Sequence, residues 1–185
     1  MANKEISEFS QTNSWAMVHG LLLGAWGVLT LAFACISLIC NPMLGWAGEV
    51  MFVGSPIVAY FLSKRFRWCV AGDGTFSFGR AFSHTFLMGL YATVWVALAT
   101  YVYLAFVDNG RVFDAYEAQL QRPEVMAEVK RLGMTQTWED MGGATKMVNV
   151  MRAVGAGNYA GMIVYLSLFV APIISAVIAV MLKRK

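Results

Sequence analysis

The chain consists of four long apolar stretches, two short polar connectors and one long polar segment, residues 108–157. The apolar stretches cover residues 15–40, 46–66, 81–107 and 159–182. Each is long enough for a helix to cross a hydrocarbon layer about 30 Å thick, which takes roughly 20 residues. The runs are continuous rather than alternating, which favours helices over barrel strands. The pattern predicts an all-α fold, an integral membrane four-helix bundle that forms one domain over residues 1–185.

The composition agrees with a membrane protein. Hydrophobic residues make up 58% of the 185 residues and charged residues only 14%, which is outside the usual balance of a soluble domain. The first stretch is too long for the apolar part of a secretory signal, and the charges before it sum to net negative. We therefore interpret it as a permanent span. The net charge of +3 does not indicate nucleic-acid binding, because much of it flanks the spans.

Basic residues indicate the orientation of the spans. Lys64, Arg65, Arg67 and Arg80 frame the connector between the second and third stretches, and residues 183–185 are all basic. The connector between the first two stretches has no charge. By the positive-inside rule we expect both termini in the cytoplasm and segment 108–157 on the opposite, extracytoplasmic side.

The long segment is predicted to form short amphipathic helices rather than a loose loop. Its apolar residues recur at helical spacing in three stretches. Such helices beside a membrane lie on its surface, cover the ends of the spans or bind a partner, and periodicity does not separate these possibilities. The candidate interface residues in this segment are Phe113, Tyr116, Trp138, Met147 and Met151.

Two stripes of small residues predict close packing between helices. The first span carries Gly20, Gly24 and Gly27 on one face, and the fourth carries Ser167, Ala171 and Ser175 at four-residue spacing. Small side chains let helix backbones approach closely in lipid. The stripes either form a dimer or partner face or pack inside the protein's own bundle, and we favour packing inside the bundle.

Three polar side chains inside the spans are candidates for function. Glu49 lies about one turn inside its span, where a carboxyl group is costly unless it is paired, neutral or reaches the interface. We weigh proton or ion transport against snorkelling or a hydrogen bond to a neighbouring helix. His19 and His84 lie about one turn inside the same end of their spans and could approach each other. Two histidines without a third ligand make a poor metal site, so we favour hydrogen bonding.

The entry to the third span is rich in aromatic residues. An Asp-Gly pair at 73–74 favours a tight turn, and Phe76, Phe78 and Arg80 follow it. These side chains could anchor the span at the membrane interface or bind a partner, and we favour the anchor.

The sequence carries no motif of a known chemistry. The stretch 142–146 resembles part of a phosphate loop but lacks the required spacing, and no group of residues has the neighbours of a catalytic triad. The three cysteines are irregularly spaced, which indicates neither a disulfide framework nor a zinc site. We expect a protein that is not an enzyme, with no cofactor, no metal and no small-molecule ligand.

The layout and one motif resemble a family of small four-span inner-membrane proteins of Bacteroidota that is grouped as a domain of unknown function. The resemblance covers nearly the whole chain and includes the long helical segment before the fourth span. It depends on Gly20 and Gly24 in the first span and on the residues around the entry to the third, namely Asp73, Gly74, Phe76, Phe78, Gly79, Ala81 and Phe82. Gly72 stands where the family usually has a basic residue. The resemblance implies a location in the bacterial inner membrane and supplies no catalytic residues.

Two functions follow as hypotheses. The first is an accessory or assembly subunit that works through helix packing and an external helical cap, with membrane lipid and either a second copy or another membrane protein as partners. The alternative is a small oligomeric transporter or a protein that handles a lipid substrate, with Glu49 as its titrating group.

Overall fold

The computed structural model describes residues 2–72 and 74–184, with side chains described from residue 7 onward. Over this part of the chain the secondary structure is helical, and the predicted all-α class is confirmed. The elements in order are α1 (Ala2–Ile39), η1 (Pro42–Leu44), α2 (Gly45–Ala71), α3 (Phe78–Val102), η2 (Tyr103–Val107), α4 (Arg111–Leu120), α5 (Pro123–Arg131), α6 (Thr135–Asp140), α7 (Gly143–Val154) and α8 (Ala156–Leu182).

Four of the helices in the described residues are long and apolar enough to cross a membrane. They are α1, α2, α3 with its π-helical continuation η2, and α8, so the four predicted spans are confirmed as helices. Each helix extends past the predicted apolar stretch. Helix α1 begins at Ala2 rather than near residue 15, because residues 2–14 include neither glycine nor proline to stop a helix.

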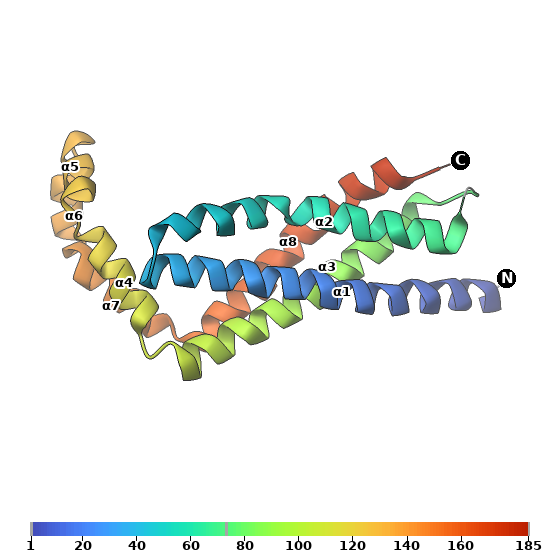
Figure 1. Ribbon diagram of the computed structural model, residues 1–185, viewed down its shortest axis with the longest axis horizontal. Coiled ribbons are helices and arrows are strands. Elements are labelled where there is room, and N and C mark those ends of the chain that lie inside the picture. Colours follow the sequence, from blue (N-terminus) through green and yellow to red (C-terminus); the bar gives the residue numbers. More distant parts are fainter. Residues whose placement is uncertain (1, 73, 185) are drawn as a thin grey trace.

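The four long helices form a bundle in which α3 holds the central place (Figure 1). It packs along much of its length against α1 on one side and α8 on the other. The remaining helix, α2, packs mainly against α1, and Trp26 of α1 donates its indole N–H to the Met51 carbonyl of α2 at 3.0 Å. In Figure 1, α8 diverges from α2 in the direction of α4. Near the chain termini the two helices are in contact, since Arg67 of α2 donates to the Leu182 carbonyl of α8 at 3.4 Å.

The two ends of the bundle differ, and we name them by what they carry. The termini end holds both ends of the chain and the connector between α2 and α3. The arm end holds the turn between α1 and α2 and the arm, which consists of α4 to α7 and runs crosswise to the bundle (Figure 1). The predicted helical character of segment 108–157 is thus confirmed.

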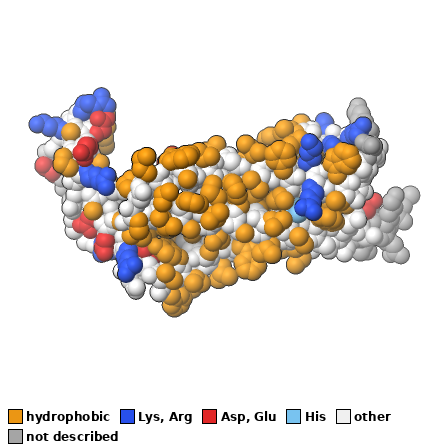
Figure 2. All heavy atoms as spheres, viewed as in Figure 1, with side chains coloured by type: hydrophobic (Ala, Val, Ile, Leu, Met, Phe, Trp, Pro, Cys, Tyr) orange, Lys and Arg blue, Asp and Glu red, His pale blue; other side chains and the backbone are white. Residues whose placement is uncertain are grey.

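Several of the best-buried side chains of the bundle lie toward the termini end, where Phe66, Phe76 and Leu182 are almost fully buried. A short antiparallel bridge joins this region to the end of the chain. The Phe76 amide donates to the Arg184 carbonyl and the Arg184 amide donates to the Phe76 carbonyl, both at 3.0 Å. The middle of the bundle instead presents a broad hydrophobic surface, with charged side chains gathered toward the two ends (Figure 2).

Candidate functional site

A chain of buried polar side chains crosses three helices near the termini end. His19 Nδ1 of α1 lies 3.0 Å from His84 Nε2 of α3. His84 Nδ1 lies 3.2 Å from the Ser63 hydroxyl of α2, which is 2.9 Å from the Thr85 hydroxyl. All four side chains are almost completely buried, with exposed fractions between 0% and 3%. The two histidines that sequence reasoning brought near each other therefore belong to a longer network.

The last member of this network sets the direction of its hydrogen bonds. Thr85 donates to the Ala81 carbonyl at 2.9 Å, and a carbonyl oxygen only accepts. With its one proton used, Thr85 accepts from Ser63, which in turn accepts from His84 Nδ1–H. A neutral His84 then accepts at Nε2 from His19 Nδ1–H. Both imidazoles are neutral in this arrangement because a buried charge needs a counter-ion, and no carboxylate in the described chain contacts either ring.

Aromatic rings seal the network from the termini end. The Phe66 ring stacks on His84 with centroids 4.1 Å apart and an interplanar angle of 9°. The Phe76 ring meets Phe66 edge-on, with ring centroids 5.8 Å apart. The Arg80 guanidinium lies 5.7 Å from the Phe66 ring centre, within the range of a cation–π interaction. Arg80 also donates to the side chain of Gln11. The network is thus closed to bulk water on this side.

These contacts correct the expected role of Phe76. We expected it at the membrane interface with Phe78, but its side chain is only 1% exposed. The backbone bridge to Arg184 and the packing on Phe66 hold it inside. Phe78 remains exposed and stacks on Phe82 at 6.0 Å, while Arg80 points inward to Phe66 and Gln11.

The glycine stripe of α1 packs inside the bundle. A Cβ atom on Gly20 would lie 2.5 Å from the Tyr91 Cβ, and one on Gly24 would lie 2.9 Å from the Trp95 Cβ. A Cβ on Gly27 would lie 2.6 Å from Val96 Cγ2. All three glycines therefore face α3, which leaves this stripe no room for a partner molecule.

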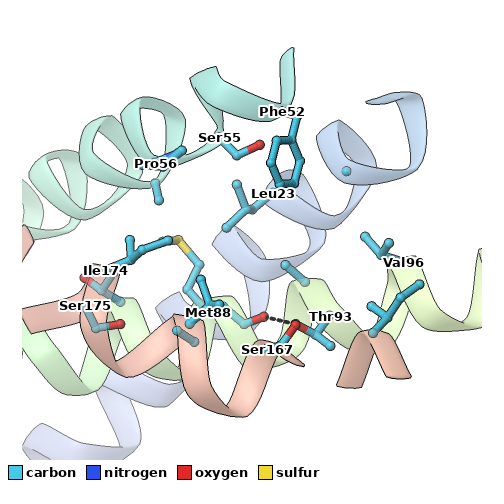
Figure 3. A pocket seen from close by; sticks show the side chains of 18 of the residues that line it. Leu23, Phe52, Ser55, Pro56, Met88, Thr93, Val96, Ser167, Ile174 and Ser175 are labelled. Atoms are coloured by element: carbon cyan, nitrogen blue, oxygen red, sulfur yellow. Dashed lines mark hydrogen bonds between the residues drawn. The ribbon is translucent and has the colours of Figure 1, made fainter. Parts of the chain in front are cut away.

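A cavity of about 280 Å³ lies between the four long helices beside the network (Figure 3). It extends from Thr85, which belongs to the network, toward the arm end. The small-residue stripe of α8 forms one wall, since Ser167, Ala171 and Ser175 all line it. The other walls are mostly apolar and include Leu23, Phe52, Pro56, Met88 and Val96.

Glu49 does not line this cavity. It is exposed on α2, one turn nearer the arm end than Phe52. No hydrogen bond or ion pair joins it to another side chain in the described part of the protein.

Polar contacts on the arm hold α4 and α7 together. Arg152 of α7 pairs with Asp114 of α4 at 2.5 Å and with Glu117 at 3.5 Å. Glu117 also accepts from the Thr145 hydroxyl at 2.6 Å. At the base of the arm, the buried Asp108 accepts from the Val112 amide at 3.1 Å and so satisfies a free N–H group in the first turn of α4. The arm is therefore a folded unit attached to the bundle.

Apolar residues on α4 and α7 face the bundle. Phe113, Tyr116 and Met151 line a second cavity, of about 300 Å³, between the arm and the bundle. Tyr159 of α8 closes it, with its hydroxyl donating to the Met151 carbonyl at 2.9 Å and its ring 5.9 Å from Phe113. These three candidate interface residues thus join the arm to the spans rather than forming its free surface. Trp138 and Met147 are half-buried.

The outer part of the arm, α5 and α6, has no buried residue. Apolar side chains are exposed there, with Leu132 58% and Met134 46% exposed. On α5, Arg131 pairs with Glu128 at 2.5 Å. This hydrogen bond lowers the pKa of the Glu128 carboxyl and raises the pKa of Arg131, so both remain charged at neutral pH.

Four polar residues of these sites were missed by sequence reasoning: Ser63, Thr85, Asp108 and Arg152. Ser63 lies three residues before Phe66 on the same helix face, and Thr85 follows His84 directly. A search for hydroxyl groups beside each histidine could have found Thr85, whereas no histidine lies near Ser63 in the sequence. Across the described residues, no three His, Cys, Asp or Glu side chains gather as a metal site would require.

Comparison with known proteins decides the family. A family model described as "Protein of unknown function (DUF4199)" matches residues 14–184. The chain belongs to this family. The match includes the four spans, the buried network and the arm, and it confirms the expected resemblance to a family of unknown function. Occurrence in Bacteroidota stays a prediction. No curated protein matches this DUF4199 chain, and no solved structure matches it.

Proposed function

We propose that this DUF4199 protein is a non-catalytic accessory or assembly subunit of the bacterial inner membrane that binds a partner protein through its arm. The observation that carries the proposal is that the base of the arm is held by ion pairs while its outer helices, α5 and α6, are exposed. The base is fastened by Asp114, Glu117 and Arg152, whereas α5 and α6 bury none of their side chains. Exposed apolar side chains on a folded, projecting element mark an interaction surface.

The charges of the arm favour a protein partner over a lipid surface. Helices that lie on anionic membranes carry many Lys and Arg residues on their polar face. Residues 108–157 carry six basic and seven acidic residues, a net charge of 6 − 7 = −1. Such a segment gains no net attraction from anionic headgroups, whereas mixed charges around an apolar patch suit a protein interface.

The distribution of basic residues supports the proposed orientation. Lys64, Arg65 and Arg67 near the end of α2 and Arg80 near the start of α3 share the termini end with Lys183 and Arg184, which follow α8. The positive-inside rule then puts this end in the cytoplasm and the arm outside it. The proposed partner is accordingly a protein of the inner membrane or of the envelope beyond it.

No observation favours catalysis or transport over this role. The His19–His84–Ser63 chain is sealed by Phe66 and contains no carboxylate. Glu49, the titrating group of the transport hypothesis, lies outside the central cavity. The cavity offers mostly apolar walls, which suit neither an ion nor a proton path.

Photo-cross-linking in native membranes tests the arm as a binding surface. We would place a photoreactive amino acid at Leu132, with matched positions at Glu124 on α5 and at the lipid-facing Val177 on α8. We expect Leu132 to give a discrete protein adduct and Val177 to give only lipid adducts. The adduct should also form with Glu124 at lower yield, because that side chain belongs to the polar face.

A charged substitution provides the second half of the test. Leu132→Glu should reduce recovery of the same partner in mild detergent without changing the amount of protein in the membrane. An adduct of twice the chain mass would identify a second copy as the partner. Lipid adducts alone from Leu132, with no protein co-purifying, would contradict the proposal.

A further inference from the structure

We propose that the central cavity binds one acyl chain of a phospholipid with a primary ammonium headgroup, and that Glu49 recognises this headgroup. The inference concerns the spans and does not depend on the arm or its partner. It joins two observations: an apolar cavity inside the bundle and a lone carboxylate one helical turn beyond it.

The walls of the cavity suit an alkyl chain. Thr30, Ser55, Thr85 and Thr93 line it, but each hydroxyl donates to the carbonyl four residues earlier in its own helix. Figure 3 shows the bond of Thr93. Only Ser167 and Ser175, among the described lining residues with hydroxyls, lack such a bond. Two hydroxyls among so many apolar groups are too few to hold a charged or sugar-like molecule.

The volume of the cavity fits part of one acyl chain of a phospholipid. A cavity of about 150 Å³ lined by apolar side chains binds benzene. The cavity of about 280 Å³ therefore has room for an alkyl segment of roughly ten carbons, in proportion to that case. This is a substantial part of a phospholipid chain and less than a whole lipid.

The opening lies between α2 and α8, on the side of the bundle that faces lipid. Phe52 of α2 is 72% exposed and Val170 of α8 is 49% exposed, although both line the cavity. The α1–α3 and α3–α8 sides are closed by close packing: a Cβ atom on Gly20 would lie 2.5 Å from the Tyr91 Cβ, and one on Gly89 would lie 3.5 Å from the Ala171 Cβ. In a bilayer, the molecules next to such an opening are lipid chains.

The depth of the opening places a headgroup near Glu49. Phe52 and Ile163 lie about 10 Å from the arm-end termini of α2 and α8, at a rise of 1.5 Å per residue. A chain that enters there belongs to a lipid whose headgroup lies near those termini. Glu49 precedes Phe52 by three positions and Pro56 by seven, which puts all three on one face of α2.

The charge at this position selects the headgroup. Glu49 is the only charged residue between positions 9 and 63, and the whole of α8 is uncharged. Because the basic residues of α2 lie at its opposite end, the Glu49 carboxylate attracts an ammonium group and repels an anionic headgroup. Phosphatidylethanolamine has the required primary ammonium, and phosphatidylglycerol is the matched anionic lipid.

Photoreactive lipids test both parts of the proposal. The full chain is reconstituted in phosphatidylcholine vesicles that contain a small amount of phosphatidylethanolamine or phosphatidylglycerol with a diazirine on the acyl chain. We expect labelled peptides from the cavity walls in α2 and α8. The ethanolamine probe should label them about two- to fivefold more, the range of one exposed ion pair.

Matched variants separate the cavity from the headgroup site. Ser167→Phe fills the cavity and should reduce labelling by both probes, whereas Val177→Phe, on the exposed face of α8, should not. Glu49→Gln should abolish the preference between the probes and leave cavity labelling in place. Glu124→Gln on the arm is the control for loss of a carboxylate.

Each result supports or overturns one part. If Ser167→Phe does not fold, as judged by its melting curve, the smaller Ser167→Leu takes its place. Unchanged labelling in a folded cavity-filling variant would overturn the proposal that an acyl chain binds in the central cavity. Equal labelling by the two probes, or a preference that survives in Glu49→Gln, would overturn the role of Glu49. None of these results depends on the cross-linking of Leu132, so failure of the arm proposal is seen separately.

Discussion

At the residue scale, the buried network is notable because one backbone carbonyl determines the protonation of two histidines. The Thr85 hydroxyl donates its single hydrogen bond to the Ala81 carbonyl. Each side chain before it in the network must then donate to the next one. The direction runs from His19 through His84 and Ser63 to Thr85. Such an arrangement satisfies every member while keeping charge out of the membrane interior.

This direction predicts the tautomers of both histidines. We expect the ¹⁵N spectrum of the protein in detergent micelles at neutral pH to show His19 and His84 protonated at Nδ1 and bare at Nε2. In Thr85→Val the acceptor for Ser63 is removed, so Ser63 can donate to His84 Nδ1 and a mixture of tautomers should appear. A wild-type His84 protonated at Nε2, or identical spectra for the variant, would contradict the assigned direction.

At the scale of elements, the close contact between α1 and α3 depends on the glycines of α1, which have no side chain. Gly20 lies so close to α3 that an added Cβ would meet both the Tyr91 Cβ at 2.5 Å and the Met88 carbonyl oxygen at 3.0 Å. Backbone atoms of a packed helix cannot move aside cheaply. The stripe therefore determines how closely the two helices approach, and α3 in turn carries His84 to His19.

Substitution of Gly20 by alanine should separate the two helices. Gly20→Ala should lower the free energy of unfolding by about 1–3 kcal/mol, the usual cost of overpacking. Gly161→Ala on α8 is the matched control, because a Cβ there meets no atom within 4 Å; it should be neutral or slightly stabilising, since alanine favours helix. Thermal unfolding in detergent measures both, and equal melting temperatures would show that the approach is looser than 2.5 Å.

At the scale of the whole molecule, one arginine joins the two helices at the base of the arm, α4 and α7. Arg152 reaches from α7 to two acids of α4, and the apolar side chains below it rest on the bundle through Tyr159. The outer helices α5 and α6 depend on this base for their position, because they bury no residue of their own.

Removal of the Arg152 side chain should loosen the arm and leave the spans intact. In Arg152→Ala we expect amide hydrogen exchange in α4 and α7 to rise by up to about fivefold, equivalent to about 1 kcal/mol for partly exposed ion pairs. Arg131→Ala is the control, since Arg131 pairs with Glu128 of its own helix, α5. Exchange that is equal in the two variants would show that Arg152 does not fasten the arm.

Local composition and spacing were enough to predict the all-α class and the four long apolar helices. Residues 15–40 and 159–182 contain no charged residue, and a backbone in lipid must pair its own polar groups, which only helices and closed barrels allow. The helical character of the arm was equally visible in its periodicity. These features depend on local composition and spacing, so they are readable without knowledge of neighbours.

The contacts between residues far apart in the chain are seen only in the folded protein. The spacing of Gly20, Gly24 and Gly27 showed a packing face but not that α3 occupies it. Phe76 looked like a surface anchor until the end of the chain paired with its backbone, and Ser63 drew no attention until α2 brought it to His84. The physical reason is that lipid solvates any apolar face equally well, so hydropathy assigns a helix to the membrane without choosing its partner. That choice depends on side-chain shape and hydrogen bonds between residues far apart in the chain.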